Sequence, residues 1–208
     1  MSRPPDLEAR RQLLDRVIDY LADHGLGEAT LRPLANALNT SPTRLMHHFG
    51  SKGELLAAAL ARTEELHRQI EARWVRQSPQ ITQSDVLRKW WKWMLASRRN
   101  LNQVRLGLEA ATLNSTVTGL AGDVRAEQIG AWRGMIERRL LARGVPAHDA
   151  RIEASRLKAA FTGLTLDLVA TGDRKRLTEA LERILADFER RLELPNRPPA
   201  GATKRRGS

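Results

Sequence analysis

Residues 30–56 read TLRPLANALNTSPTRLMHHFGSKGELL, a stretch that is typical of two short helices joined by a tight turn and followed by a longer helix. Asn39 stands where the first helix has to end, because Asn tolerates the left-handed backbone conformation better than most residues. Ser41 then supplies an N-cap hydroxyl, and Pro42 takes the first helical position, where its missing N–H costs nothing. These residues predict a second helix that begins at residue 42.

The predicted second helix, residues 42–48, divides its side chains between two environments. Leu45 and Phe49 face a core. The outward side chains are Thr43, Arg44, Met46, His47 and His48. A short exposed helix that a partner helix braces across a three-residue turn has the geometry that enters a DNA major groove. Ser51 and Glu54 then form an S-x-x-E capping box, which predicts a long helix from residue 52.

An ordered set of residues carries a resemblance to a known family. The set is Thr30, Ala35, Ser41–Pro42, Leu45, His48–Phe49, Ser51–Lys52 and Glu54–Leu55–Leu56, and it extends back through Leu13–Leu14–Val17–Ile18–Leu21. It resembles the DNA-binding domain of the tetracycline-repressor (TetR) family over residues 10–60. Family members usually have Gly in place of Asn39. They usually have Tyr in place of Met46, so the resemblance implies one phosphate contact fewer here.

The exposed side chains and the resemblance together predict a DNA-binding surface. We expect Thr43, Arg44 and His47 to face base edges. We expect Thr30, His48 and Lys52 to face phosphates. The complete predicted set is Thr30, Arg32, Ser41, Pro42, Thr43, Arg44, Met46, His47, His48 and Lys52.

The pattern of apolar residues and helix breakers predicts an all-α protein, with no run of strand-like alternation. Helices are expected near residues 8–24, 31–38, 42–48, 52–76, 83–98, 100–113, 121–143, 147–171 and 174–193. Residues 8–52 are expected to form the helix-turn-helix domain, and residues 53–194 a larger helical domain. The resemblance implies that the larger domain binds a ligand and dimerises. Residues 195–208, rich in Pro, Gly and basic residues, are expected to be a disordered tail.

Charge and composition restrict the possible partners. The chain has 35 Lys and Arg against 24 Asp and Glu, a formal net charge of +11, yet residues 1–50 contain six of each sign. The DNA prediction therefore rests on the helix-turn-helix pattern, and charge only assists association. The absence of Cys excludes disulfides and thiolate metal sites. The longest apolar run, near residues 55–61, is too short to span a bilayer, and the N-terminus has no secretory signal. We expect a cytoplasmic protein with no membrane partner.

The scarce aromatic residues gather in the predicted second domain, where the resemblance implies a small-molecule effector. Large apolar side chains inside a bundle form either core or pocket, and the sequence leaves both open. Arg105, Glu109 and Thr112 share one helix face, either as a structural ion pair or as polar handles for a mostly apolar ligand. The predicted ligand-binding set is Trp90, Trp93, Met94, Arg105, Leu108, Glu109, Thr112, Trp132, Met135 and Phe161.

The last two helices are the predicted dimer interface. Residues 157–169 are apolar around most of the helix, so they need cover on two sides, and a partner chain would supply one. The last helix carries an apolar stripe that runs from Leu177 to Leu192. Two-fold symmetry would place the recognition helices about one DNA turn, ~35 Å, apart on a palindromic operator. The predicted interface is Phe161, Leu164, Leu168, Leu177, Leu181, Ile184 and Phe188.

Signatures of enzymes are missing from the sequence, which has no G-x-S-x-G, no Gly-rich phosphate loop, no H-E-x-x-H and no Cys. Glu64-x-x-His67 lacks the second motif that a di-iron site requires, and His67 is expected at the surface. We therefore expect no enzyme activity, cofactor or metal, and a dimeric, ligand-responsive repressor of operator DNA. The alternative is a helical small-molecule-binding protein without DNA binding, which Met46 and the neutral N-terminal region favour.

Overall fold

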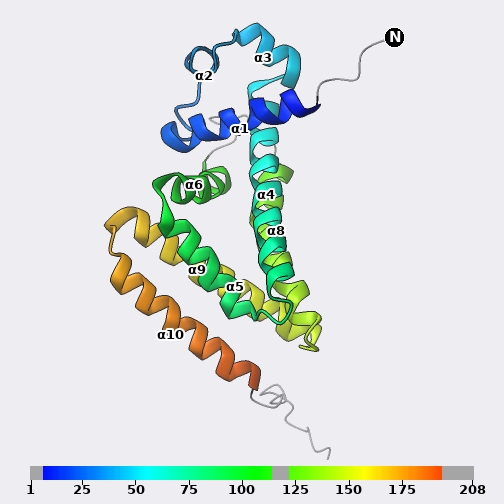
Figure 1. Ribbon diagram of the computed structural model, residues 1–208, viewed down its shortest axis with the longest axis vertical. Helices are drawn as coiled ribbons and strands as arrows, with labels where there is room; N and C mark the ends of the chain where they lie inside the picture. The colour runs from blue at the N-terminus through cyan, green and yellow to red at the C-terminus, as the bar shows by residue number, and fades with distance from the viewer. Residues whose placement is uncertain (1–6, 114–121, 194–208) are drawn as a thin grey trace, which may run out of the picture.

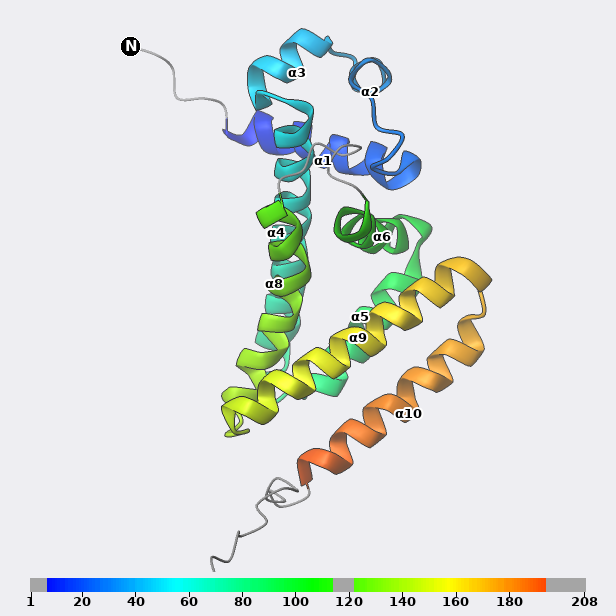
Figure 2. The ribbon, with the colours of Figure 1, turned by 180° about the vertical axis from the view of Figure 1, so that it is seen from behind.

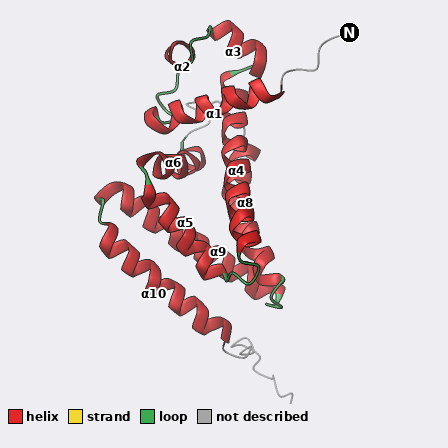
Figure 3. Cartoon of the chain, viewed as in Figure 1, coloured by secondary structure: helices red, strands yellow, loops and turns green. Residues whose placement is uncertain are grey.

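The computed structural model describes residues 7–113 and 122–193, and within these two ranges every regular element is a helix (Figure 1, Figure 3). The helices are α1 (Leu7–His24), α2 (Leu31–Ala37), α3 (Pro42–Phe49), α4 (Lys52–Gln77), α5 (Gln83–Ala96), α6 (Arg98–Thr112), α8 (Gly122–Leu141), α9 (Ala147–Thr171) and α10 (Arg174–Glu193). The predicted all-α fold class is confirmed. The tail predicted for residues 195–208 lies outside the described residues.

The turn between α2 and α3 forms as its residue types require. Asn39 has a φ of 52°, the left-handed conformation, and the amide of Thr40 donates back to the carbonyl of Ala35 at 2.9 Å. The Ser41 hydroxyl accepts the Arg44 amide at 3.1 Å, and this cap starts α3. Arg16 of α1 donates to the carbonyl of Leu38 at 2.8 Å. The turn is therefore fixed from within and from α1, which gives α3 a defined direction.

The start of α4 is held equally firmly. The Ser51 hydroxyl accepts the Glu54 amide at 3.2 Å, and the Glu54 carboxylate accepts the Ser51 amide at 2.7 Å, so the predicted capping box is present. Gly50 has a φ of +84°, and a Cβ at this position would collide with the Glu54 carboxylate. Only glycine therefore joins α3 to this capped helix without strain.

Two separate hydrophobic cores divide the molecule. The N-terminal core contains buried aliphatic residues of α1, α2 and α3 together with Leu55–Leu60 of α4, and Leu106 and Ala110 of α6 complete it. The second core lies among α5, α8, α9 and α10 and includes Trp90, Trp91 and Phe161. α4 reaches both, since Ile70 and Trp74 near its end pack against the second core. Figure 2 shows α6 between the N-terminal helices and the larger bundle.

The apolar stripe of α10 packs inside its own chain. α10 lies against α5 and α9, and Leu177, Leu181 and Phe188 are at most 2% exposed. Phe161 and Leu168 of α9 are at most 5% exposed. The prediction that these five side chains face a partner is therefore corrected, because neighbouring helices already cover them and they are core residues. Leu164 and Ile184, from the same predicted set, are half-buried.

Candidate functional site

The first candidate surface is the outer side of α3, at one end of the molecule (Figure 1). Thr43, Arg44, His47 and His48 are exposed, while Leu45 on the opposite side is fully buried. Phe49 is also buried, and the guanidinium of Arg10 lies over its ring, 4.9 Å from the ring centroid. α3 therefore has a polar outer side on a firmly anchored helix, as the sequence predicts for a recognition helix.

The residues around α3 differ in how much of their hydrogen-bonding capacity is used. Thr30 is the N-cap of α2, but its side chain makes no capping bond, whereas Ser41 uses its hydroxyl to cap α3. Arg32 is exposed on α2, and Lys52, half-buried, begins α4. Thr30 and Arg32 are thus better placed than Ser41 for new contacts.

Met46 and Pro42, the remaining residues of the predicted DNA-binding set, are half-buried. Met46 packs against the N-terminal core. Pro42 occupies the first turn of α3. Both positions support the helix more than they offer polar groups to a ligand. The whole DNA-binding set stays a prediction.

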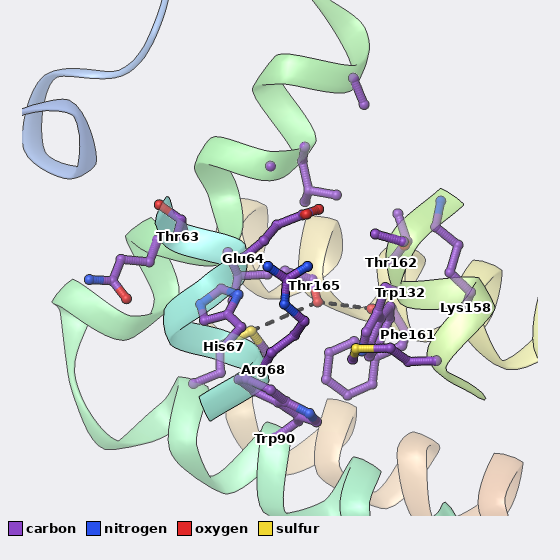
Figure 4. A pocket seen from close by; sticks show the side chains of 18 of the residues that line it. Thr63, Glu64, His67, Arg68, Trp90, Trp132, Lys158, Phe161, Thr162 and Thr165 are labelled. Atoms are coloured by element: carbon purple, nitrogen blue, oxygen red, sulfur yellow. Dashed lines mark hydrogen bonds between the residues drawn. The ribbon is translucent and has the colours of Figure 1, made fainter. Parts of the chain in front are cut away.

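The second candidate site is a cavity of about 350 Å³ lined by α4, α5, α6, α8 and α9 (Figure 4). This volume lies within the usual range for small-molecule pockets. Its larger apolar lining residues are Leu60, Trp90, Met94, Val104, Leu108, Trp132, Met135 and Phe161. Its polar lining residues are Thr63, Glu64, His67, Arg68, Gln103, Arg138, Lys158, Thr162 and Thr165.

The cavity brings together part of the predicted ligand-binding set. Six of its members line the cavity, namely Trp90, Met94, Leu108, Trp132, Met135 and Phe161. Trp93 instead stacks edge-on against His67 and Trp90, with ring centroids 5.4 and 5.3 Å away. The Thr112 hydroxyl donates to the carbonyl of Leu108 within its own helix. Neither Trp93 nor Thr112, nor the pair Arg105 and Glu109, belongs to the cavity lining.

Arg105 and Glu109 fasten α6 to the N-terminal helices. Their side chains pair at 3.1 Å, Arg105 donates to the carbonyl of Ala22 at 3.2 Å, and Glu109 accepts the amide of Leu26 at 2.7 Å. Gly25 has a φ of +80°, and a Cβ there would lie 3.2 Å from the Glu109 carboxylate. We call this arrangement the α6 clasp. Of the two roles that the sequence leaves open for Arg105 and Glu109, these contacts favour a structural ion pair over polar groups that bind a ligand.

Replacement of Glu109 by Ala is expected to lower the free energy of unfolding by ~1–3 kcal/mol. The reason is that the amide of Leu26, whose residue is fully buried, loses its acceptor and Arg105 loses its counter-charge. Urea denaturation measures this difference, and exchange of the Leu26 amide proton should accelerate. Thr112→Ala on the same helix is the control and should change stability by less than ~0.5 kcal/mol. Equal stability of Glu109→Ala and the parent protein would contradict the clasp.

His67 is one of the cavity residues that sequence reasoning missed. It was expected at the surface, but its ring is largely enclosed by Trp90 and Trp93, and its Nε2 is buried without a hydrogen-bond partner in the described part of the chain. Desolvation lowers its pKa to about 4, so the ring is neutral at pH 7. The bulky Trp residues of α5 were the only available signal that the helix face around His67 is covered.

The lowered pKa of His67 makes stability depend on pH. Between the ordinary value of about 6.5 and the folded value of about 4, the unfolded chain binds a proton that the folded chain excludes. Acidification through this window should therefore remove up to ~3 kcal/mol of stability. Denaturation at several pH values should show this slope in the parent protein and in His148→Phe, which changes an exposed histidine. His67→Phe should lack it, and an unchanged slope in that variant would refute the assignment.

Glu64, Arg68, Arg138 and Lys158 were also missed as cavity residues. They lie on α4, α8 and α9, and charged residues on helices are ordinarily solvated, so the sequence carried no signal for them. Across residues 7–113 and 122–193 no group of His, Asp and Glu is arranged to hold a metal ion. No helix in the same ranges is long and apolar enough to cross a membrane.

Comparison with known proteins agrees with the helix-turn-helix geometry. Residues 13–59 match the family model for bacterial regulatory proteins of the tetR family. No curated protein matches the chain in sequence. The fold is shared with a TetR-family transcriptional regulator from Rhodococcus sp., with a TM-score of 0.67 at 19% identity over 86% of this chain and 96% of that chain.

Two further solved structures share the fold. A transcriptional regulator from Pseudomonas aeruginosa has a TM-score of 0.65 at 21% identity, over 89% of this chain and 92% of that chain. A transcriptional regulator from Saccharomonospora viridis, solved in complex with choline, has a TM-score of 0.59 at 25% identity, over 88% of this chain and 97% of that chain. Residues 13–59 thus belong to the tetR family of bacterial regulatory proteins, and the helical body behind them has the fold of these solved transcriptional regulators.

Proposed function

We propose that this regulator is a repressor that binds a palindromic operator as a dimer and leaves it when a small molecule occupies the cavity. The observation that carries the proposal is that α4 and α6 each line the cavity and also belong to the N-terminal core. A ligand in the cavity therefore touches the two helices on which the DNA-binding helices rest.

α4 and α6 each use different residues for the N-terminal core and for the cavity. α4 contributes Leu56 and Ala59 to the N-terminal core, and its next turns supply Thr63 and His67 to the cavity. α6 places Gly107 in the cavity lining, while its neighbour Leu106 is buried in the N-terminal core. A ligand that binds one arrangement of these helices better than another shifts the population toward it, and operator DNA must weaken ligand binding by the same factor.

The outer side of α9 supports a dimer. Ile152, Leu166 and Val169 are 46%, 54% and 43% exposed. Among them lie Ala159 and Gly163, both exposed, and a Cβ added at Gly163 would meet no atom of the chain within 4 Å. Small residues between large apolar ones let a second helix approach closely, and a second copy would cover the whole strip by two-fold symmetry. This strip replaces the α10 stripe as the proposed interface.

The relative from Saccharomonospora viridis was solved with choline, so a protein of this fold accommodates a small molecule. For this chain, the volume of the cavity and its apolar walls favour a small-molecule ligand. Its identity is a separate question, because the polar residues that line each cavity decide which compound is preferred.

Operator binding can be tested by fluorescence anisotropy with the DNA upstream of the chain's own gene. Tight, salt-dependent and sequence-specific binding is the expected result. Binding no tighter than that to unrelated DNA would favour the alternative of a small-molecule-binding protein that has lost DNA recognition.

Gly107→Leu tests whether the cavity is the effector site. Gly107 lines the cavity, and a Cβ added there meets nothing within 4 Å, so the larger side chain should fill space that the ligand needs. Operator affinity should stay within about twofold of the parent value, while release by any active compound should require at least ~10-fold more of it. Unaltered release in this variant would place the effector site elsewhere.

A further inference from the structure

We propose that the cavity is built for an anionic compound with an apolar body, whose acidic group is held by Arg68, Arg138 and Lys158. This inference rests on the proposed function, in which the cavity is the effector site, and it names the class of effector. It departs from the choline complex of the relative, since choline is a cation.

The body of the ligand is defined by the cavity walls. Trp90 and Phe161 are 5% exposed, and the ring of Trp132 packs edge-on against that of Phe161 at 4.8 Å between centroids. Met94, 1% exposed, and Leu108 add flexible and aliphatic surface. Such walls favour hydrocarbon or aryl groups and offer little to a strongly hydrated molecule.

The charges around the cavity favour a negative head group. Among the residues whose side chains the structure describes, its charged lining consists of the cations Arg68, Arg138 and Lys158 and one acid, Glu64. Glu64 already takes part in an interaction within the chain. In contrast, the three cations form no ion pair or side-chain hydrogen bond with any residue in the described ranges. Arg139, next to Arg138, does pair with an acid, Glu71, at 3.7 Å.

The three cations come from three helices that enclose the cavity. Arg68 belongs to α4, Arg138 to α8 and Lys158 to α9. Figure 4 shows Arg68 beside His67 on one wall and Lys158 beside Thr162 on another. Arg68 and Arg138 are exposed and Lys158 is half-buried. A carboxylate or similar group in the cavity would therefore meet cations that come from three helices, and it would gain charge-assisted hydrogen bonds from them.

His67 supplies a second, independent indication that the cavity holds a polar group. Its Nε2 is buried, lies in a residue of the cavity lining, and has no hydrogen-bond partner among the described residues. An unpaired buried polar atom is unfavourable until a partner arrives. A neutral imidazole can donate one hydrogen bond to an acidic oxygen, so His67 complements Arg68, which follows it on α4.

The proposal can be tested with three compounds that share one aryl body: phenylbutanoate, phenylbutanamide and phenylpropyl-trimethylammonium. Isothermal titration of the full-length protein gives each Kd. The carboxylate should bind at least ~10-fold more tightly than the amide, and the ammonium compound more weakly than either. In Arg68→Gln/Lys158→Gln the preference for the carboxylate should fall below about threefold while the Kd of the amide is unchanged.

Two further variants complete the test. Arg73→Gln removes an exposed cation of α4 that does not line the cavity, and it should keep the full preference. Gly107→Leu should weaken all three compounds, which places their binding in the cavity. Equal affinities for carboxylate and amide, or tightest binding of the ammonium compound, would overturn the anion proposal and leave the effector site standing. Failure of all three compounds to bind would count against both.

Discussion

Leu166→Glu is expected to yield a folded monomer whose operator affinity is at least about two orders of magnitude below that of the parent protein. Leu166 is 54% exposed in the single chain, so the substitution removes no core packing. In the proposed dimer the same position is covered by a second copy, and an unpaired carboxylate would be buried twice across the two-fold axis. A monomer reaches one half-site only and loses the gain from linked binding.

Analytical ultracentrifugation and anisotropy measure the two consequences of Leu166→Glu separately. Circular dichroism should show unchanged helix content, which separates loss of assembly from loss of fold. Leu141→Glu is the matched control, because Leu141 is 43% exposed at the end of α8 and does not belong to the α9 strip. That variant should remain dimeric. A fully dimeric Leu166→Glu would show that the interface lies elsewhere.

Arg44→Ala is expected to weaken operator binding by ~2–6 kcal/mol. One base contact is worth ~1–3 kcal/mol, and a symmetric dimer loses the contact in both half-sites. Arg44 is exposed on α3, and only its backbone amide takes part in the Ser41 cap, so the fold should be retained. Anisotropy with the operator and with variants at each base pair should show relaxed preference at one position per half-site.

Lys52→Gln provides the contrast to Arg44→Ala. If Lys52 faces a phosphate, the variant should bind DNA of every sequence more weakly by the same factor. The slope of log affinity against log salt concentration should fall in magnitude by about two, one for each protomer. Its sequence preference should stay intact. If Arg44→Ala also retained the parent preference, Arg44 would not be a base-reading residue, and Thr43 and His47 would carry the recognition.

The parts of this protein that could be predicted from sequence are those fixed by neighbouring residues. The left-handed Asn39, the Ser41 cap and the capping box of Ser51 and Glu54 are all local, and all appear as expected. Such signals act over three or four residues, and each is satisfied by its own backbone. This is why the order of the helices followed from the sequence.

Features that depend on which face of a helix meets which neighbour could not be predicted in the same way. Arg105 and Glu109 have the spacing of an isolated i,i+4 pair, and nothing in that spacing shows that their partners are Ala22 and Leu26, some 80 residues away in the chain. The stripe on α10 has the correct period for burial, but a period does not distinguish cover by the same chain from cover by a second one. The burial of His67 could not be predicted for the same reason, because the Trp residues that cover it lie on another helix.

The participation of Leu106 and Ala110 in the N-terminal core has a consequence for protein engineering. A chimaera that joins residues 1–60 to the body of another regulator would leave a hole where these two side chains belong, and Leu26 would lose the acceptor that Glu109 provides. The recognition module is thus not portable as a contiguous segment. A biosensor that uses these DNA-binding helices therefore also needs the face of α6 that packs against them. The second regulator is compatible only if its corresponding helix has a Leu, an acidic residue and an Ala at the positions of Leu106, Glu109 and Ala110.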